Sequence, residues 1–224
     1  MVAQEPIATR ELLHDAPRSL RALSLEHADG WGVALSSGDD AWQIHRNTRC
    51  AARCEQYAAI APSPARVIVA HIRKKTVGEL AIANTHPFRH GQFVFAHNGT
   101  LSIIDKLIAA ASPDRLGEIV GDTDSERFFA FVLTHIDEAG DIERGVVRAI
   151  RALHTWDDVG SANFLLAAGT RVYAYRQGRS LYTLSRANAT LVASERLTDE
   201  DWLEVPERAL AILDGLTLQS RDQS

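Results

Sequence analysis

Apolar positions along the chain follow two different spacings, and each spacing predicts a different kind of element. Leucines at helical intervals predict a helix over residues 9–26, and similar patterns predict helices over residues 103–111, 127–136 and 142–154. Residues 66–73 form a run rich in β-branched residues that ends in charge, and Phe93 begins a second apolar run. Both runs predict buried strands.

The last third of the chain changes character. Six short apolar runs separated by Gly, Arg and Asn turns predict strands at 164–167, 172–175, 181–184, 190–193, 202–205 and 209–213. Such close spacing favours antiparallel pairing, because parallel crossovers need a dozen or more residues. Residues 1–224 are therefore predicted to form a single α+β domain in which helices cover stacked sheets.

Composition narrows the class of protein. The 224 residues are 46% hydrophobic and 24% charged, with a formal net charge of −5, and basic residues never run beyond a pair. This excludes the basic surface of a nucleic-acid binder. Apolar runs are too short to cross a membrane, and the acidic N-terminal region does not match a signal peptide. We therefore expect a cytoplasmic protein with no nucleic-acid or membrane partner.

Two cysteines, Cys50 and Cys54, lie four residues apart in a stretch predicted as helix. A structural zinc site needs four ligands and no second pair exists, while a redox Cys-x-x-Cys motif has a different spacing. We expect ordinary reduced thiols, no metal site and no cofactor.

Several polar clusters at predicted strand ends allow both a structural and a functional interpretation. Asn98 and Gly99 form the dipeptide typical of a hairpin turn, yet an amide side chain beside a glycine N–H also suits an oxyanion hole. Arg73 is either a surface charge or a ligand-binding cation. Asp122 and Asp124 are either helix-capping acids or binding groups.

The order of these clusters resembles the class II glutamine amidotransferases, which belong to the N-terminal-nucleophile hydrolases. The resemblance rests on five motifs between about residues 27 and 130: Asp-Gly-Trp-Gly at 29–32, Ala-His-Ile-Arg at 70–73, Asn-Thr-His-Pro-Phe at 84–88, Ala-His-Asn-Gly at 96–99 and Gly-Asp-Thr-Asp-Ser-Glu at 121–126. Residues 193–197 and Trp202 further resemble small stand-alone members, such as the γ-glutamyl amidohydrolase of the ergothioneine pathway.

The resemblance implies a four-layer αββα sandwich of mainly antiparallel sheets and assigns roles to individual residues. Arg73 would bind the α-carboxylate of glutamine or of a γ-glutamyl group, and Asp124 the α-ammonium. Asn98 and Gly99 would form the oxyanion hole. Two positions near the substrate, Thr76 and His86, are also carried over, although Lys74 and Val77 depart from the pattern of the sugar-phosphate branch.

The family mechanism requires an N-terminal cysteine whose own α-amine acts as the base, and the sequence begins Met1-Val2-Ala3 instead. The first strand of the sandwich is expected to be absent together with this cysteine. One explanation is a start placed too late or a trimmed chain, and the other is a genuine loss of catalysis. The chain as written is expected to be inactive.

Three functions remain open on this basis. The leading hypothesis is a glutamine amidotransferase or γ-glutamyl amide hydrolase acting through a thioester, with glutamine or a γ-glutamyl amide as ligand and an ammonia-accepting partner protein when glutamine is used. The first alternative is an inactive glutamine-binding or scaffolding subunit. The second is a binding domain of the same fold with an unrelated ligand.

Overall fold

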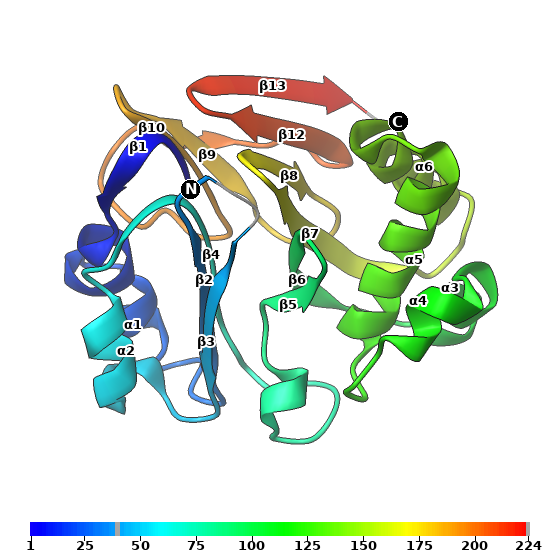
Figure 1. Ribbon diagram of the computed structural model, residues 1–224, viewed down its shortest axis with the longest axis horizontal. Coiled ribbons are helices and arrows are strands. Elements are labelled where there is room, and N and C mark those ends of the chain that lie inside the picture. Colours follow the sequence, from blue (N-terminus) through cyan, green and yellow to red (C-terminus); the bar gives the residue numbers. More distant parts are fainter. Residues whose placement is uncertain (39–40, 223–224) are drawn as a thin grey trace.

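The computed structural model describes residues 1–38 and 41–222, and within them the chain forms four layers (Figure 1). Two antiparallel sheets pack face to face. Helices α1 and α2 cover the outer face of one sheet, and α3 to α6 cover the outer face of the other. This is the αββα sandwich that the family resemblance implies, and it agrees with the α+β domain expected from the sequence pattern.

The first sheet contains seven strands among the described residues, and every neighbouring pair is antiparallel. In spatial order they are β11 (Leu203–Glu204), β9 (Tyr182–Ser185), β10 (Ala189–Ala193), β1 (Val2–Ala8), β4 (Pro64–Ile72), β2 (Trp31–Ser36) and β3 (Gln43–Asn47). Strand β1 therefore lies inside this sheet, between β10 and β4.

The second sheet contains six strands among the same residues and is also antiparallel throughout. In spatial order they are β13 (Thr217–Asp222), β12 (Ala209–Asp214), β8 (Arg171–Tyr175), β7 (Gly160–Ala168), β6 (Phe93–Leu101) and β5 (Phe88–His90). Strand β5 covers only the first part of β6, so the second part of β6 has an open edge.

The two long helices, α5 and α6, cover the second sheet, and the other helices are short. In chain order the helices are α1 (Leu20–Leu23), α2 (Glu55–Ile60), α3 (Ile104–Ala110), α4 (Pro113–Gly117), α5 (Asp124–Ala139) and α6 (Ile142–His154), with a π-helical turn at Glu11–Asp15 and 3-10 turns at Ala51–Arg53 and Ile82–Asn84.

Local sequence explains the boundaries of α5. The Thr123 side chain accepts a hydrogen bond from the Glu126 backbone N–H, which caps the start. Gly140 adopts a left-handed conformation that ends the helix. The apolar face between these caps packs on the six-stranded sheet, so the start of α5 is held at a fixed height beside the end of β6.

Three apolar clusters fill the spaces between the layers: one between α3–α6 and the six-stranded sheet, one between the two sheets, and one between α1, α2 and the seven-stranded sheet. Alternation along β4 shows this directly. Val67 and Val69 face the other sheet, whereas Ile68 faces the short helices. None of the helices in the described ranges is long and apolar enough to cross a membrane.

Three expectations require correction. The first strand is not absent, because Val2–Ala8 forms β1. The register of β1 with β4 shifts between Val2 and Ile7. Only Val2 and Ala3 of this strand are fully buried. Asn98 and Gly99 do not form a turn, because β6 continues through them to Leu101 and pairs with β7 throughout. The region 9–26 contains two short helical segments rather than one long helix.

Candidate functional site

The second half of β6 has one edge that no strand covers among the described residues. The Ser102 N–H donates to the Val159 carbonyl on the β7 side, whereas the Leu101 N–H donates to Asp124 Oδ2 at 2.8 Å on the opposite side. Backbone groups alternate in direction along a strand. The Gly99 N–H therefore points to the same open edge as that of Leu101, where β5 no longer covers β6.

Position 99 requires glycine because a neighbouring strand approaches closely. A Cβ added to Gly99 would lie 2.0 Å from the Ser161 carbonyl oxygen and 2.8 Å from His97 Nε2. Any side chain would push β7 away from β6 or displace the imidazole. The glycine thus allows a tight contact beneath the free N–H.

Asn98 faces the opposite sheet. Val94 and Ala96 lie in the apolar layer between the sheets, and alternation places Asn98 on the same face. It is exposed although it lies in the middle of a paired strand. Its neighbour across the ladder is Asn163, which is only 2% exposed and makes four hydrogen bonds to the backbone of the loop 177–180.

Arg73 follows directly after β4 and is almost completely buried. Its guanidinium donates to the carbonyl oxygens of Val77 and Glu79, in the loop that follows it. Burial lowers the pKa of Arg73, and the carboxylates of Asp29 and Asp122 oppose that change. A buried guanidinium that is bonded only to neutral carbonyls still carries a charge that an anion can neutralise.

The loop after Arg73 is fastened to three other segments. The Lys75 N–H donates to Asp29 Oδ2, and the Glu79 N–H donates to Asp122 Oδ1. The Thr76 hydroxyl lies 3.3 Å from the Thr100 hydroxyl at the end of β6. These contacts bring Thr76 and the arginine loop next to the open edge of β6.

A buried polar network joins β6 to the start of α5. His97 Nδ1 lies 2.8 Å from Ser125 Oγ, and His97 Nε2 lies 2.9 Å from the Ser161 carbonyl oxygen. Because a carbonyl only accepts, Nε2 carries the proton and Nδ1 accepts from Ser125. Burial lowers the pKa of His97, while Asp124 and the bond to Ser161 oppose it. The imidazole is therefore neutral at pH 7 and holds Asp124 and Gly99 in a fixed relation.

Two further histidines pack against each other nearby, with their rings tilted by 40°. The ring centroids of His71 and His86 are 4.5 Å apart, and His86 also packs on Phe88 at 4.4 Å. Burial lowers the pKa of His71 to about 3 and that of His86 well below its usual value. Both ring nitrogens of His86 are buried without a hydrogen-bond partner. His86 thus lies behind His71 and is not among the residues that line the cavity described next.

A cavity of about 580 Å³ lies in front of Asn98 and passes through the seven-stranded sheet. Its wall includes His71 and Val192, on the face of the seven-stranded sheet that packs on the other sheet, and Asn98 of β6 opposite them. It also includes residues that face the short helices, such as Ile72 and Leu191. Residues on opposite faces of one sheet can line the same cavity only where the sheet itself is interrupted.

Met1 closes one end of this cavity. It is 7% exposed, and its α-ammonium donates to the Ile68 carbonyl oxygen at 3.0 Å. Burial lowers the pKa of this amine to about 5. Cys50 and Cys54 do not line the cavity; Cys50 instead contacts the Ser24 carbonyl.

Of the six residues that the sequence singled out, only Asn98 lines this cavity. Thr76 and Asp124 contact the end of β6 through Thr100 and Leu101, next to Gly99, and Arg73 lies in the loop that carries Thr76. Three supporting residues received no role from the sequence: His71, His97 and Asn163. Only their unusual burial as polar residues within strands could have indicated one.

Comparison with known proteins decides the family. The profile described as class-II glutamine amidotransferases matches residues 15–205. Gamma-glutamyl-hercynylcysteine sulfoxide hydrolase of Mycobacterium tuberculosis is 32% identical over 236 aligned residues, which cover 97% of this chain and 94% of that protein. The chain belongs to the class II glutamine amidotransferases.

Other similarities agree with this family. A putative glutamine amidotransferase of Haemophilus influenzae is 30% identical, with 72% of this chain and 56% of that protein covered. A class-II domain protein from Silicibacter pomeroyi superposes with a TM-score of 0.74 at 20% identity and covers 99% of this chain and 96% of that one. The allosteric regulatory enzyme of purine biosynthesis gives 0.75 at 18% identity, covering 98% and 48%. These two structures support the fold of this amidotransferase.

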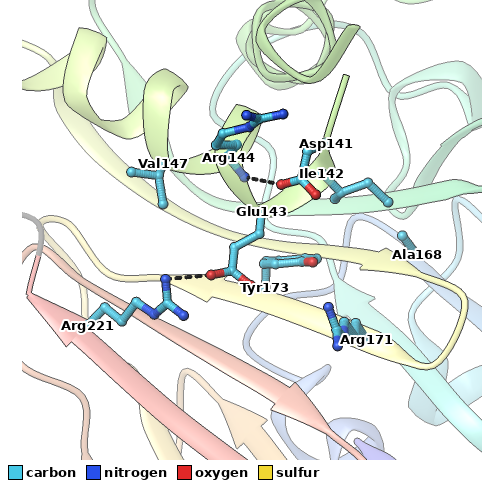
Figure 2. A pocket seen from close by; sticks show the side chains of 9 residues that line it. All are labelled: Asp141, Ile142, Glu143, Arg144, Val147, Ala168, Arg171, Tyr173 and Arg221. Carbon is cyan, nitrogen blue, oxygen red and sulfur yellow. Dashed lines mark hydrogen bonds and ion pairs between the residues drawn. The ribbon is translucent and has the colours of Figure 1, made fainter. Parts of the chain in front are cut away.

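A second hollow of about 480 Å³ lies on another side of the amidotransferase, between α6, β8 and β13 (Figure 2). The Glu143 carboxylate pairs with Arg221 across it, and Asp141 caps the start of α6 through the Arg144 N–H. Arg171 and Arg144 in its wall bond outside it, to Asp214 and to the Ala139 carbonyl, and none of the five sequence motifs lies in its wall. Within the described ranges no group of three or more His, Cys, Asp or Glu residues is arranged to hold a metal ion.

Proposed function

We propose that this amidotransferase binds a γ-glutamyl amide through its amino-acid end and stabilises the oxyanion formed when the γ-carboxamide is attacked. The observation that carries the proposal is the free Gly99 N–H on the open edge of β6, beside the cavity-facing Asn98 amide. Two neutral donors on one rigid strand suit an oxyanion, because they need no reorganisation as charge develops.

The charged ends of the ligand have counterparts beside these donors. Arg73 offers a buried guanidinium to an α-carboxylate, and Asp124 offers a buried carboxylate to an α-ammonium. Asp124 is bonded to the Leu101 N–H, two residues beyond Gly99, so its position is tied to the oxyanion donors. A γ-glutamyl group held at both ends would present its carboxamide to β6.

Hydrolysis also requires a nucleophile. In the proposed reaction a thiolate attacks the γ-carboxamide carbon, the adjacent α-amine passes the thiol proton to the departing amine, and water then cleaves the thioester. Neither Cys50 nor Cys54 lines the cavity. We therefore assign binding and oxyanion stabilisation to residues 1–224, and expect no hydrolysis until a cysteine with a free α-amine stands at the cavity.

The proposed substrate class is a γ-glutamyl amide of the kind named for the M. tuberculosis relatives, with glutamine as its smallest member. Where glutamine is used, an ammonia-consuming partner protein completes the reaction. A cytoplasmic setting belongs to the same proposal. The second candidate is a glutamine-binding subunit without catalysis, favoured by the position of both cysteines away from the cavity.

Calorimetric titration of the chain with L-glutamine and with a γ-glutamyl amide tests the binding proposal. We expect saturable heat, and at least about tenfold weaker binding for Asp124→Asn, which removes one charge from a charge-assisted contact. Asp105→Asn, on the exposed side of α3, is the matched control and should bind as the parent does. Absence of heat with both ligands at millimolar concentration contradicts the proposal.

A further inference from the structure

The cavity in front of Asn98 extends away from the groups proposed for the amino-acid end of the ligand. Arg73, Thr76, Gly99 and Asp124 are not among the residues that line it. Its volume of about 580 Å³ lies in the range of pockets that enclose drug-sized molecules. An unsubstituted carboxamide would leave most of this space empty. A substituted γ-glutamyl amide would place its amine half there, that is, the amide nitrogen and the group attached to it.

One part of the cavity wall is the segment between β8 and β9, which crosses from the six-stranded to the seven-stranded sheet. The Asn163 amide nitrogen donates to the carbonyl oxygens of Arg179 and Ser180, at 3.1 and 3.0 Å. Its oxygen accepts from the N–H groups of Gln177 and Arg179, at 2.8 and 3.2 Å. Both donors and both acceptor positions of this side chain are used, so the backbone of Arg179 is held rigidly.

The same asparagine brings Arg179 close to the proposed oxyanion donor. Asn163 is the ladder partner of Asn98, and the side chains of such partners lie on one face of a sheet, about 5 Å apart. The backbone of Arg179 is one hydrogen bond further away, which places it on the order of 10 Å from Asn98.

Arg179 and Asp124 lie on opposite sides of β6. Asp124 accepts from the Leu101 N–H at the open edge of this strand, whereas Arg179 lies beyond the edge that pairs with β7. A γ-glutamyl amide with its ammonium at Asp124 and its carboxamide at Asn98 would therefore direct its amine half toward Arg179.

The Arg179 side chain is an exposed cation with no hydrogen bond or ion pair to any residue in the described ranges. Its neighbour Arg176 differs, because it pairs with two carboxylates at 2.7 and 3.4 Å. Elsewhere in the cavity wall, Arg18 and Glu195 pair with each other at 2.6 Å. A ligand that enters the cavity thus meets one arginine whose charge is not already neutralised.

A carboxylate in the wall could favour a cation instead, and Glu26 also lines the cavity. Glu26 follows α1, which covers the outer face of the seven-stranded sheet. Asn98 and Asn163 face the space between the two sheets, on the other side of that sheet. Arg179 is therefore the charged group placed beside the carboxamide.

We propose that Arg179 is a specificity-determining residue that binds a carboxylate on the amine half, so that γ-glutamyl amino acids bind more tightly than glutamine. The inference rests on the proposed function, because it takes the glutamyl half to lie at Arg73 and Asp124. A planar guanidinium matches a carboxylate through two parallel hydrogen bonds. One amino-acid residue beyond the amide extends the ligand by about 3.5 Å, and the arginine side chain covers the rest of the separation.

Two ligands of equal size isolate this charge. γ-L-Glutamylglycine ends in a carboxylate, and γ-L-glutamylglycinamide ends in a neutral amide of the same shape. Calorimetric titration of the chain at low salt should show about tenfold tighter binding of γ-glutamylglycine, because charge-assisted hydrogen bonds are stronger than neutral ones. The preference should shrink at about 0.5 M NaCl, since salt screens an exposed cation.

Variants assign the preference to one residue. Arg179→Ala should bind both ligands equally, and Arg179→Lys, which keeps the charge but not the planar fork, should retain a preference of about threefold. Arg151→Ala, on an exposed position of α6 outside the cavity wall, removes the same charge and should keep the full preference. Each variant should melt within about 2 °C of the parent, because both arginines are exposed.

The outcomes separate this inference from the proposed function. Equal affinity for the two ligands in the parent, or a preference that persists in Arg179→Ala, overturns the role of Arg179. If Asp124→Asn then still weakens both ligands, the proposed function stands without that role. A preference that Arg179→Ala removes supports the role of Arg179, even where Asp124→Asn has no effect and the assignment of Asp124 fails. Absence of heat with both ligands at millimolar concentration overturns the two proposals together.

Discussion

The two helix-covered layers of the sandwich differ sharply in how completely they are filled. Between α5, α6 and the six-stranded sheet, aromatic and aliphatic side chains are fully buried, and Phe95 stacks on Phe129 with centroids 4.8 Å apart. Between α1, α2 and the seven-stranded sheet, a cavity reaches the other side of the sheet. The same chain thus builds one closed layer and one open layer.

The site lies where these regions meet. Strand β6 and the start of α5 belong to the closed layer and carry Asn98, Gly99 and Asp124. The open layer supplies the space in front of them. Rigid elements can therefore hold the proposed oxyanion donors in place, while the cavity in the open layer leaves room for a ligand in front of them. Each prediction below tests this division.

The same chemical deletion should have unequal effects in the two layers. Leu133, on α5, is 0% exposed, and Leu133→Ala should lower the free energy of unfolding by about 3 to 5 kcal/mol. Leu23, on α1, already borders the cavity, and Leu23→Ala should cost about 1 kcal/mol or less. Urea unfolding of both variants measures the difference. Equal losses would show that the open layer is packed as tightly as the closed one.

The open layer should also make stability depend on pH. Burial lowers the pKa of the Met1 amine from 8.0 to about 5. Between these values the unfolded chain binds a proton that the folded chain does not, so stability rises with pH across this window. The limiting difference, from well below pH 5 to well above pH 8, is about 4 kcal/mol, and about 3 kcal/mol of it falls between pH 5 and pH 8.

N-terminal acetylation separates Met1 from the histidines. His71, with its pKa lowered to about 3, also destabilises the fold as pH falls below 6.5, but acetylation leaves it unchanged. Urea unfolding at pH 5, 6.5 and 8 should therefore give a shallower slope for the acetylated chain. Parallel slopes would place the Met1 amine in solvent rather than in the sheet.

The closed layer was also the more predictable from sequence. The periodicity at 142–154 predicts α6 with both ends correct, because its apolar face packs on one continuous sheet. Strands β7, β8 and β10 follow from apolar runs for the same reason. By contrast, β1 escaped detection because Gln4, Glu5 and Pro6 are exposed within it. A strand beside an interruption lacks the burial that produces an apolar pattern.

The sequence motifs identified the candidate site residues but did not predict their backbone conformation. The Asn98–Gly99 dipeptide favours a turn by local preference, yet pairing with Asn163 and Ala162 keeps it extended. That pairing joins residues far apart in sequence, which local preference does not encode. For the same reason the sequence did not indicate a role for His97, whose partners Ser125 and Ser161 are also distant in sequence. The roles of Arg73, Thr76, His86 and Asp124 remain predictions.

Substitution of Gly99, where β7 closely approaches β6, should have an intermediate effect on stability. Gly99→Ala would place Cβ against the Ser161 carbonyl and force β6 and β7 apart, which should cost about 1 to 3 kcal/mol. Gly117→Ala, at the end of α4 with open space around it, is the matched control and should be neutral or stabilising by up to about 1 kcal/mol. Thermal unfolding compares the two. An unchanged Gly99→Ala variant would contradict the close approach of the strands.

The smallest effect on stability should come from the residue closest to the proposed chemistry. Asn98 is exposed to the cavity, so Asn98→Ala should change the free energy of unfolding by no more than about 0.5 kcal/mol. Asn163→Ala, the same substitution on the paired strand, removes four buried hydrogen bonds and should cost about 2 to 3 kcal/mol.

Asn98 and Asn163 lie opposite each other in one ladder pair, so their variants separate an effect on stability from an effect on ligand binding. In calorimetric titration, Asn98→Ala should weaken binding of a γ-glutamyl amide about threefold to tenfold, as loss of one hydrogen bond does, while leaving the melting temperature unchanged. Binding equal to that of the parent would remove Asn98 from the ligand site. A large loss of stability would instead show that the open edge of β6 is part of the packed scaffold, because a side chain that faces an empty cavity has nothing to hold in place.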